Sequence, residues 1–98
     1  MIISSGVVDA NVSGGQAIEL TLTTETRVGL FILGQAGDHN NHEFCIEASP
    51  DDVDWFKLPG ITRGEFPIFT DVIAQKVRVC TLKTEGSSSQ VKATIVAI

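Results

Sequence analysis

The stretch AQKVRVCTLKT, residues 74–84, decides the fold class, because apolar and charged side chains alternate along it. In an extended chain Val77 and Val79 point to one side, while Lys76 and Arg78 point to the other. This period of two predicts a half-buried β-strand, with the two valines facing inward. Helical periodicity is almost absent from the rest of the chain, so we expect an all-β protein.

Working outward from this stretch, the same alternation recurs in QAIELTLTT (16–24), HEFCIEAS (42–49) and QVKATIVAI (90–98). The inward faces predicted there are Ile18, Leu20 and Leu22; Phe44, Ile46 and Ala48; and Val91, Ala93, Ile95 and Ala97. RVGLFIL (27–33) is nearly continuously apolar, which predicts a central strand covered on both faces. Gly29 inside it indicates a bulge or a close approach of other atoms to the backbone.

Turn signals separate these stretches. SPDD (49–52) is turn chemistry before a short strand in VDWFKL (53–58), and EGSSS (85–89) predicts a hairpin loop into residues 90–98. PIFTDV (67–72) predicts a short edge strand, because Pro67 cannot donate to a ladder. Residues 2–12 are either the first strand or an exchanged arm, whereas the apolar strand at the other end should be tied into the sheet or a partner.

About seven to eight strands with frequent turn signals predict an antiparallel β-sandwich, of the jelly-roll or the immunoglobulin-like kind. The length of 98 residues predicts one domain, residues 1–98. The net charge is −5, so we expect no nucleic acid as a partner. The N-terminal residues lack the basic start and apolar run of a signal peptide, and no stretch has the length of a membrane helix. We therefore expect synthesis in a cytosol-like compartment and no membrane partner.

The two cysteines, Cys45 and Cys80, lie on either side of Trp55 in the sequence, which invites comparison with an immunoglobulin domain. Their spacing is short for that pattern, and a reducing compartment disfavours a disulfide. We expect two free, partly buried thiols, with a disulfide as the alternative.

GQAGDHNNHEF (34–44) holds the densest group of potential ligands, including the only two histidines, His39 and His42. Residues three apart in an extended chain face opposite sides, so this spacing does not bring the two imidazoles together. A structural zinc site also draws its ligands from separated pairs, and no second pair occurs. We interpret the segment as a polar loop between strands. A metal site formed across subunits, or a small metal-dependent enzyme, is the minor alternative.

Other candidates for chemistry are weak. Asp51, Asp52 and Asp54 do not follow the calcium-binding loop pattern, so we expect a solvated turn. Cys45 and His42 fall on opposite faces of a strand, which disfavours a nucleophile and base pair. Trp55 is more often a core or inter-subunit residue in such a strand than a platform for sugars. We expect no catalytic residue and no cofactor or metal.

EFCIEASPDDVDWFKLPG (43–60) runs from one strand through a Ser- and Asp-rich turn to a Trp and a second strand. KVRVCTLKTEGSSSQVKATIVAI (76–98) follows as a predicted C-terminal hairpin. These two segments resemble small phage virion proteins with β-sandwich folds, in particular capsid decoration (cement) proteins. The resemblance covers the C-terminal half at most.

The resemblance implies a non-enzymatic structural protein that binds the major capsid protein or another virion protein. It also implies a homo-oligomer, with a trimer favoured, made in the host cytoplasm and located in the virion. His39, His42, Trp55, Ile2, Ile3 and Ile98 are the residues we expect at an interaction surface. The alternative is a carbohydrate- or receptor-binding module of a virion tail or baseplate, with Trp55 and the 38–43 loop at its tip.

Overall fold

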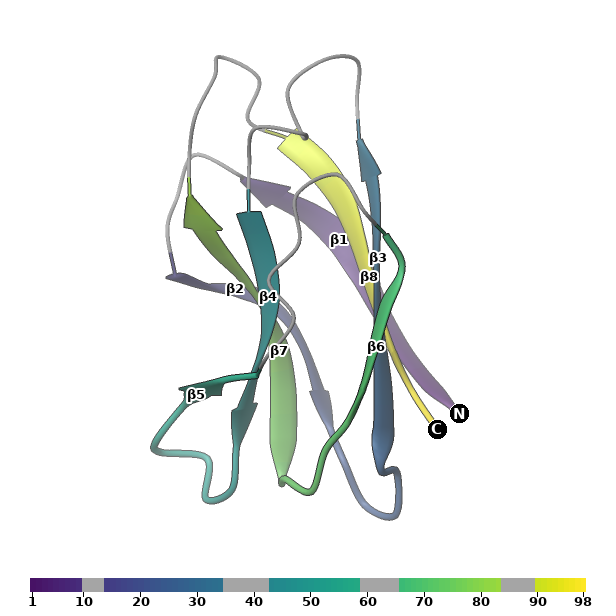
Figure 1. The fold of residues 1–98 in the computed structure, drawn as a ribbon, viewed down its shortest axis with the longest axis vertical. Coiled ribbons are helices and arrows are strands. Elements are labelled where there is room, and N and C mark those ends of the chain that lie inside the picture. Colours follow the sequence, from purple (N-terminus) through teal and green to yellow (C-terminus); the bar gives the residue numbers. More distant parts are fainter. Residues whose placement is uncertain (10–13, 35–42, 59–65, 84–89) are drawn as a thin grey trace.

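Eight strands make up the regular structure of this protein. The computed structural model describes residues 1–9, 14–34, 43–58, 66–83 and 90–98, and every regular element in these ranges is a strand. The strands are β1 (Ile2–Asp9), β2 (Gly14–Thr21), β3 (Arg27–Gly34), β4 (Glu43–Ser49), β5 (Phe56–Lys57), β6 (Ile68–Asp71), β7 (Lys76–Lys83) and β8 (Gln90–Ala97). They form two packed antiparallel sheets (Figure 1), which confirms the predicted β-sandwich.

The strand order identifies the kind of sandwich. One four-stranded sheet has the order β1–β8–β3–β6 and the other has the order β2–β7–β4–β5. The first and last strands of the chain, β1 and β8, therefore pair with each other. The next strands inward along the chain pair in the same way: β2 with β7, β3 with β6 and β4 with β5. This nested pairing is that of an eight-stranded jelly roll. Of the two predicted alternatives, the order selects the jelly roll over the immunoglobulin-like sandwich.

β7 and β8 do not form the hairpin that the sequence predicted. β7 lies between β2 and β4, whereas β8 lies between β1 and β3 in the other sheet. Val79 and Ile95 are both fully buried and belong to the same core cluster, one from each sheet. The prediction was wrong because alternation determines which side of a strand is buried. It does not determine whether the next strand pairs beside it or packs against it across the core. The loop residues 85–89 lie outside the described residues.

The core lies between the two sheets and is made of the side chains that the alternation assigned inward. The buried cluster comprises Val8, Ile18, Leu20, Leu22, Val28, Leu30, Phe44, Ile46, Ala48, Val72, Val77, Val79, Val91, Ala93, Ile95 and Ala97. All of the inward residues predicted for the alternating stretches belong to this cluster. Local alternation therefore predicted the buried face of each of these strands.

The two ends of the chain lie side by side in the same sheet (Figure 1). β1 pairs with β8 along its whole length, from Ile2 opposite Ala97 to Asp9 opposite Gln90. The backbone N–H of Ile98 donates to the carbonyl of Arg27 at 2.9 Å, which attaches the last residue to β3. The first segment is thus a strand of the sheet, and the expectation that the apolar end is tied into the sheet is confirmed.

β3 is central, as predicted, because it pairs with β8 on one side and β6 on the other. It is not covered on both faces. Its inward residues Val28 and Leu30 are fully buried, but its outward residues Phe31 and Leu33 are 39% and 68% exposed. An apolar run predicts only that both faces of a strand are apolar, and whether another layer covers each face depends on the rest of the fold. The uncovered face of this sheet is the most conspicuous surface of the protein.

Candidate interaction surface

The outward side of the β1–β8–β3–β6 sheet is an exposed apolar surface. Most of the large apolar side chains that are exposed in the described residues lie on it, at 39% to 80% exposure. We call this surface the apolar face; it comprises Met1, Ile3, Val7, Phe31, Leu33, Phe69, Val96 and Ile98. A contiguous apolar patch of more than a few hundred Å² on a water-facing surface marks an interaction site.

The register of the sheet explains how residues from distant parts of the chain meet on this face. Ile3 lies opposite Val96, Val96 opposite Gly29, and Gly29 opposite Phe69, so one row crosses all four strands. Side chains two residues further along each strand point to the same side. These strands carry apolar residues at their outward positions as well as at their inward positions. The inward residues form the core, and the outward residues form the apolar face.

A groove of about 860 Å³ runs across the apolar face at the end where the two termini lie. Gly29 and Phe69 are both among the residues that line it. A Cβ atom at Gly29 would lie 2.8 Å from Cε1 of Phe69, so the ring occupies the space above the glycine. The Phe69 ring also meets Phe31 edge to face, with 5.8 Å between centroids. Of the two predicted roles of Gly29, the structure shows the close approach, made by a side chain.

Charged groups are few on this surface and lie toward its ends. Nε of Arg27 lies 3.1 Å from Oδ1 of Asp71, and both side chains are largely exposed. Lys92 is exposed at the other end, in the row that holds Val7 and Leu33. Among the side chains that the structure describes, the charged groups of this face are thus two cations and one carboxylate, whereas the whole chain carries −5.

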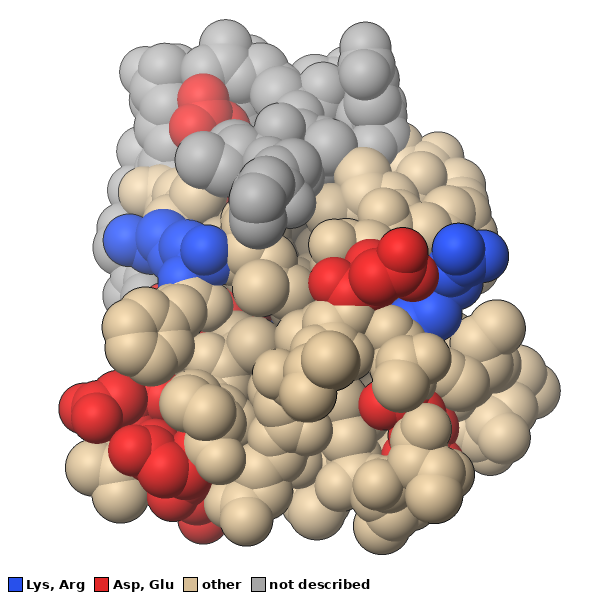
Figure 2. Space-filling view, turned by 60° about the horizontal axis from the view of Figure 1, so that its bottom comes forward, with Lys and Arg blue, Asp and Glu red and all other residues tan. Residues whose placement is uncertain are grey.

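The other acidic side chains that the structure describes lie on the β2–β7–β4–β5 sheet or in turns: Glu19, Glu25, Glu43, Glu47, Asp51, Asp52 and Asp54. Figure 2 shows acidic side chains in separate groups, the largest at the lower left, on the side where β5 lies in Figure 1. Among the described side chains, the negative charge is therefore concentrated away from the apolar face.

Trp55 lies half-buried on the opposite sheet, beside the Ser49 end of β4. The guanidinium carbon of Arg78 lies 3.9 Å from the centroid of its ring, which is a cation–π contact. Nε of Arg78 also donates to Glu47 at 2.8 Å, and Glu47 is buried. One face of the indole is thus occupied by a cation. Trp55 lies at the end of β4 that is opposite Glu43, and residues 38–42, predicted to share a tip with it, lie outside the described residues.

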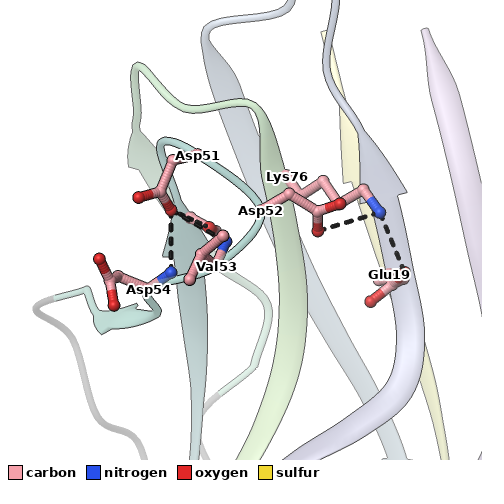
Figure 3. Close-up of polar contacts among 7 residues, drawn as sticks. Glu19, Asp51, Asp52, Val53, Asp54 and Lys76 are labelled. Atoms are coloured by element: carbon pink, nitrogen blue, oxygen red, sulfur yellow. Dashed lines mark hydrogen bonds and ion pairs between the residues drawn. The ribbon is translucent and has the colours of Figure 1, made fainter.

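The SPDD segment is a polar turn that its own carboxylates stabilise (Figure 3). Oδ1 of Asp51 accepts the backbone N–H groups of Val53 at 2.9 Å and Asp54 at 2.8 Å. These hydrogen bonds lower the pKa of Asp51 below its ordinary value of 3.8. The described ranges contain no group of three or more residues placed to hold a metal ion.

Asp52 follows Asp51 in this turn and has a positive φ of 64°, which aspartate tolerates better than most residues. Its carboxylate lies 3.2 Å from Nζ of Lys76, which is also 3.8 Å from Glu19 (Figure 3). The lysine thus connects the turn to β2, and the acidic turn is held by backbone donors and a cation of this chain.

Cys45 and Cys80 are direct cross-strand partners in β4 and β7. Both are free thiols and both are fully buried. The hydrogen bond with Cys80, followed by burial, raises the pKa of the Cys45 thiol. A fully buried thiol whose pKa is raised, as in Cys45, is a poor nucleophile, because the thiolate is the reactive form, and Cys80 is equally shielded from reagents.

The predicted surface residues fall into four groups. Ile3 and Ile98 lie on the apolar face, at 56% and 60% exposure, while Ile2 points inward and packs against the core. Trp55 lies on the other sheet, and His39 and His42 lie outside the described residues. Phe31, Leu33 and Phe69 were not predicted at this surface, because apolar residues at both parities of 27–33 do not reveal which face another layer covers.

Comparison of the chain with protein-family models, with curated proteins and with solved structures gives no match. In the ranges that the structure describes, no helix is long and apolar enough to cross a membrane. The geometry itself defines the class of protein: a jelly-roll β-sandwich with one largely apolar outer face, whose other sheet carries a partly buried ion pair and two buried thiols.

Proposed function

We propose that this chain is a structural protein of a virion, of the capsid-decoration kind, and that it works by assembling with other protein subunits. The apolar face is the observation that carries this proposal, since exposed apolar patches of this kind mark sites of protein–protein contact. The jelly roll supports it, because viral capsid proteins are among the proteins that use this fold. A fold alone does not define a function, so the proposal depends on the surface.

The resemblance of residues 43–60 and 76–98 to phage decoration proteins supplies the partners. In this proposal the chain binds the major capsid protein or another virion protein and forms a homo-oligomer, for which the resemblance favours a trimer. It is made in the host cytoplasm, ends in the virion and catalyses no reaction. The acidic, polar turns are then the solvent-facing parts of the assembled protein.

Co-sedimentation with empty capsids of the phage that encodes the chain tests this proposal. We expect the protein to sediment with the capsids at a fixed, saturable number of copies and to raise the temperature at which the shells disrupt. A basic control protein of equal size should not saturate in this way. Failure to bind capsids and every other purified virion subunit would contradict the proposal.

A carbohydrate- or receptor-binding module is the second candidate, favoured by the neighbouring Trp55 and Phe56, of which Phe56 is 57% exposed. Arg78 on the indole opposes it, because a stacked sugar needs a free aromatic face. Trp55→Ala separates the two. Loss of glycan binding with an unchanged melting temperature would support the module. A lower melting temperature, with no glycan bound by the parent protein, would support a structural role of Trp55.

A further inference from the structure

We propose that a second copy of this chain covers the apolar face, with the two β1–β8–β3–β6 sheets packed face to face. This inference rests on the proposed structural function and names the partner of one surface. It goes further by assigning the residues in contact and the symmetry of the pair. The area of the face, its charged side chains and the position of its groove support this pair.

The area of the face is at the low end of what a specific pair needs. Three of its four strands have eight residues each, and β6 has four. With strands about 4.8 Å apart and about 3.3 Å per residue, the face measures roughly 440 Å² in projection. Two such faces cover on the order of 900 Å² in total, in the range of weak and transient protein pairs. A specific pair therefore needs contact over the whole face, which a second copy of the same sheet provides.

The charge distribution favours a second copy at this face over any other face that the structure describes. Two chains that each carry −5 repel one another where their acidic groups meet. On the apolar face the described charged side chains are Arg27 and Lys92 against Asp71, so the described groups there carry no excess of acid. Packing here keeps the acidic turn of each copy away from the other, and the Arg27–Asp71 pairs lie at the margin, where water still reaches them.

The groove lies at one end of the face, near Ile3 and Ile98, and the exposed side chains of Val7 and Leu33 lie at the other end. A two-fold axis in the plane of contact and perpendicular to the strands places the groove of each copy opposite Val7 and Leu33 of the other. With the axis at the level of Leu30, Phe31 of each copy faces Gly29 of the other, over which the Phe69 ring lies. Such a pair is isologous and closed.

Mass in solution tests this inference with matched lysine variants. We expect the parent protein, at about 100 µM, to have twice the chain mass of 10.5 kDa by light scattering. Ile3→Lys and Leu33→Lys should each weaken dimerisation by at least about tenfold, because lysine must then be desolvated in the contact. Ile73→Lys is the control: Ile73 is 95% exposed and lies outside the apolar face, so this variant should remain dimeric. Circular dichroism melting curves of the monomeric variants should each show a cooperative transition, which confirms that the variants are folded.

Cross-linking tests the contact without adding charge to the face. Thr94→Cys places a thiol near the proposed axis, and Thr21→Cys places one on the outer face of the other sheet. A short bismaleimide should join Thr94→Cys into covalent dimers and leave Thr21→Cys monomeric, because Cys45 and Cys80 are buried.

Three outcomes overturn the inference. They are a monomeric parent protein, an oligomer that both lysine variants leave intact, and cross-linking of Thr21→Cys in preference to Thr94→Cys. A trimer that is insensitive to the lysine variants would remove this interface and leave the proposed function standing. Failure to bind capsids would remove the proposed function even if the pair forms.

Discussion

Gly29 and Phe69 are cross-strand partners in β3 and β6, and the Phe69 ring lies where a side chain of residue 29 would be. The two nearest ring atoms would be 2.8 and 2.9 Å from a Cβ at this position. Contacts this short require a neighbour to move. The glycine thus allows Phe69 to lie flat enough on the sheet to meet Phe31 and to form the wall of the groove.

Gly29→Ala should therefore be neutral or slightly destabilising in the parent protein and stabilising in a Phe69→Ala background. Alanine contributes about 0.4–1 kcal/mol by restricting the unfolded chain. In the parent this gain is offset by displacement of the ring, which weakens an aromatic pair of about 0.5–1.5 kcal/mol. Urea unfolding of the four proteins of this double-mutant cycle measures the coupling. Additive effects, within about 0.3 kcal/mol, would show that the ring and residue 29 do not interact.

Arg78→Met should lower the free energy of unfolding by about 2–4 kcal/mol, because it leaves the buried Glu47 carboxylate without its cation. The figure is below that for fully buried pairs because the Arg78 side chain is 25% exposed. Arg78→Lys keeps the charge but not the planar group on Trp55, so its effect should be smaller.

The control for this prediction is Arg27→Met, which breaks the exposed pair with Asp71 and should cost less than about 1 kcal/mol. Chemical denaturation of both variants at one pH and one protein concentration provides the comparison. Equal losses in the free energy of unfolding from the two substitutions would mean that the burial of Glu47 does not increase the cost of removing its cation. Replacing Glu47 and Arg78 together with apolar residues should recover part of the loss.

Asp51 should make the stability of the protein depend on pH in the acid range. Its pKa is lowered in the folded state by the backbone N–H groups of Asp54 and Val53, so the folded protein binds its proton less tightly than the unfolded chain. This contribution is fully present above the ordinary pKa of 3.8 and is lost as the pH falls through the lower, folded-state pKa.

The melting temperature of Asp51→Asn should therefore fall less than that of the parent between about pH 5 and pH 2. Asp54→Asn removes the same charge from the same turn, but residue 54 contributes its backbone N–H to the turn, which the substitution keeps. It should follow the parent more closely. Parallel curves for the parent and Asp51→Asn would contradict the assignment.

Cys45 and Cys80 should be unreactive in the folded protein. Both thiols are fully buried, and the hydrogen bond between them and burial raise the pKa of Cys45. Reaction with a coloured disulfide reagent should be on the order of 100-fold slower in buffer than in urea, because it requires local opening of the sheet. The exposed thiol of a Thr21→Cys variant is the internal control, and native thiols that react as fast as that one would contradict the burial.

Local alternation determined a large part of this protein. The inward faces of residues 18–22, 44–48, 77–79 and 91–97 follow directly from a period of two, because side-chain direction in a strand depends only on position along it. The SPDD turn follows from side chains that accept hydrogen bonds from backbone groups two and three residues away. In both cases the interacting groups are close in the sequence.

Tertiary structure alone decided which strands are neighbours and which faces are covered. The alternation of residues 76–83 and 90–98 fits one sheet or two, and only competition among all eight strands places them across the core from each other. Similarly, nothing local in RVGLFIL reveals that one face of this stretch lacks a second layer, or that Phe69 rests on Gly29. The sequence by itself therefore specified the strands and their buried sides, while the long-range pairing of the jelly roll created the apolar face and the facing cysteines.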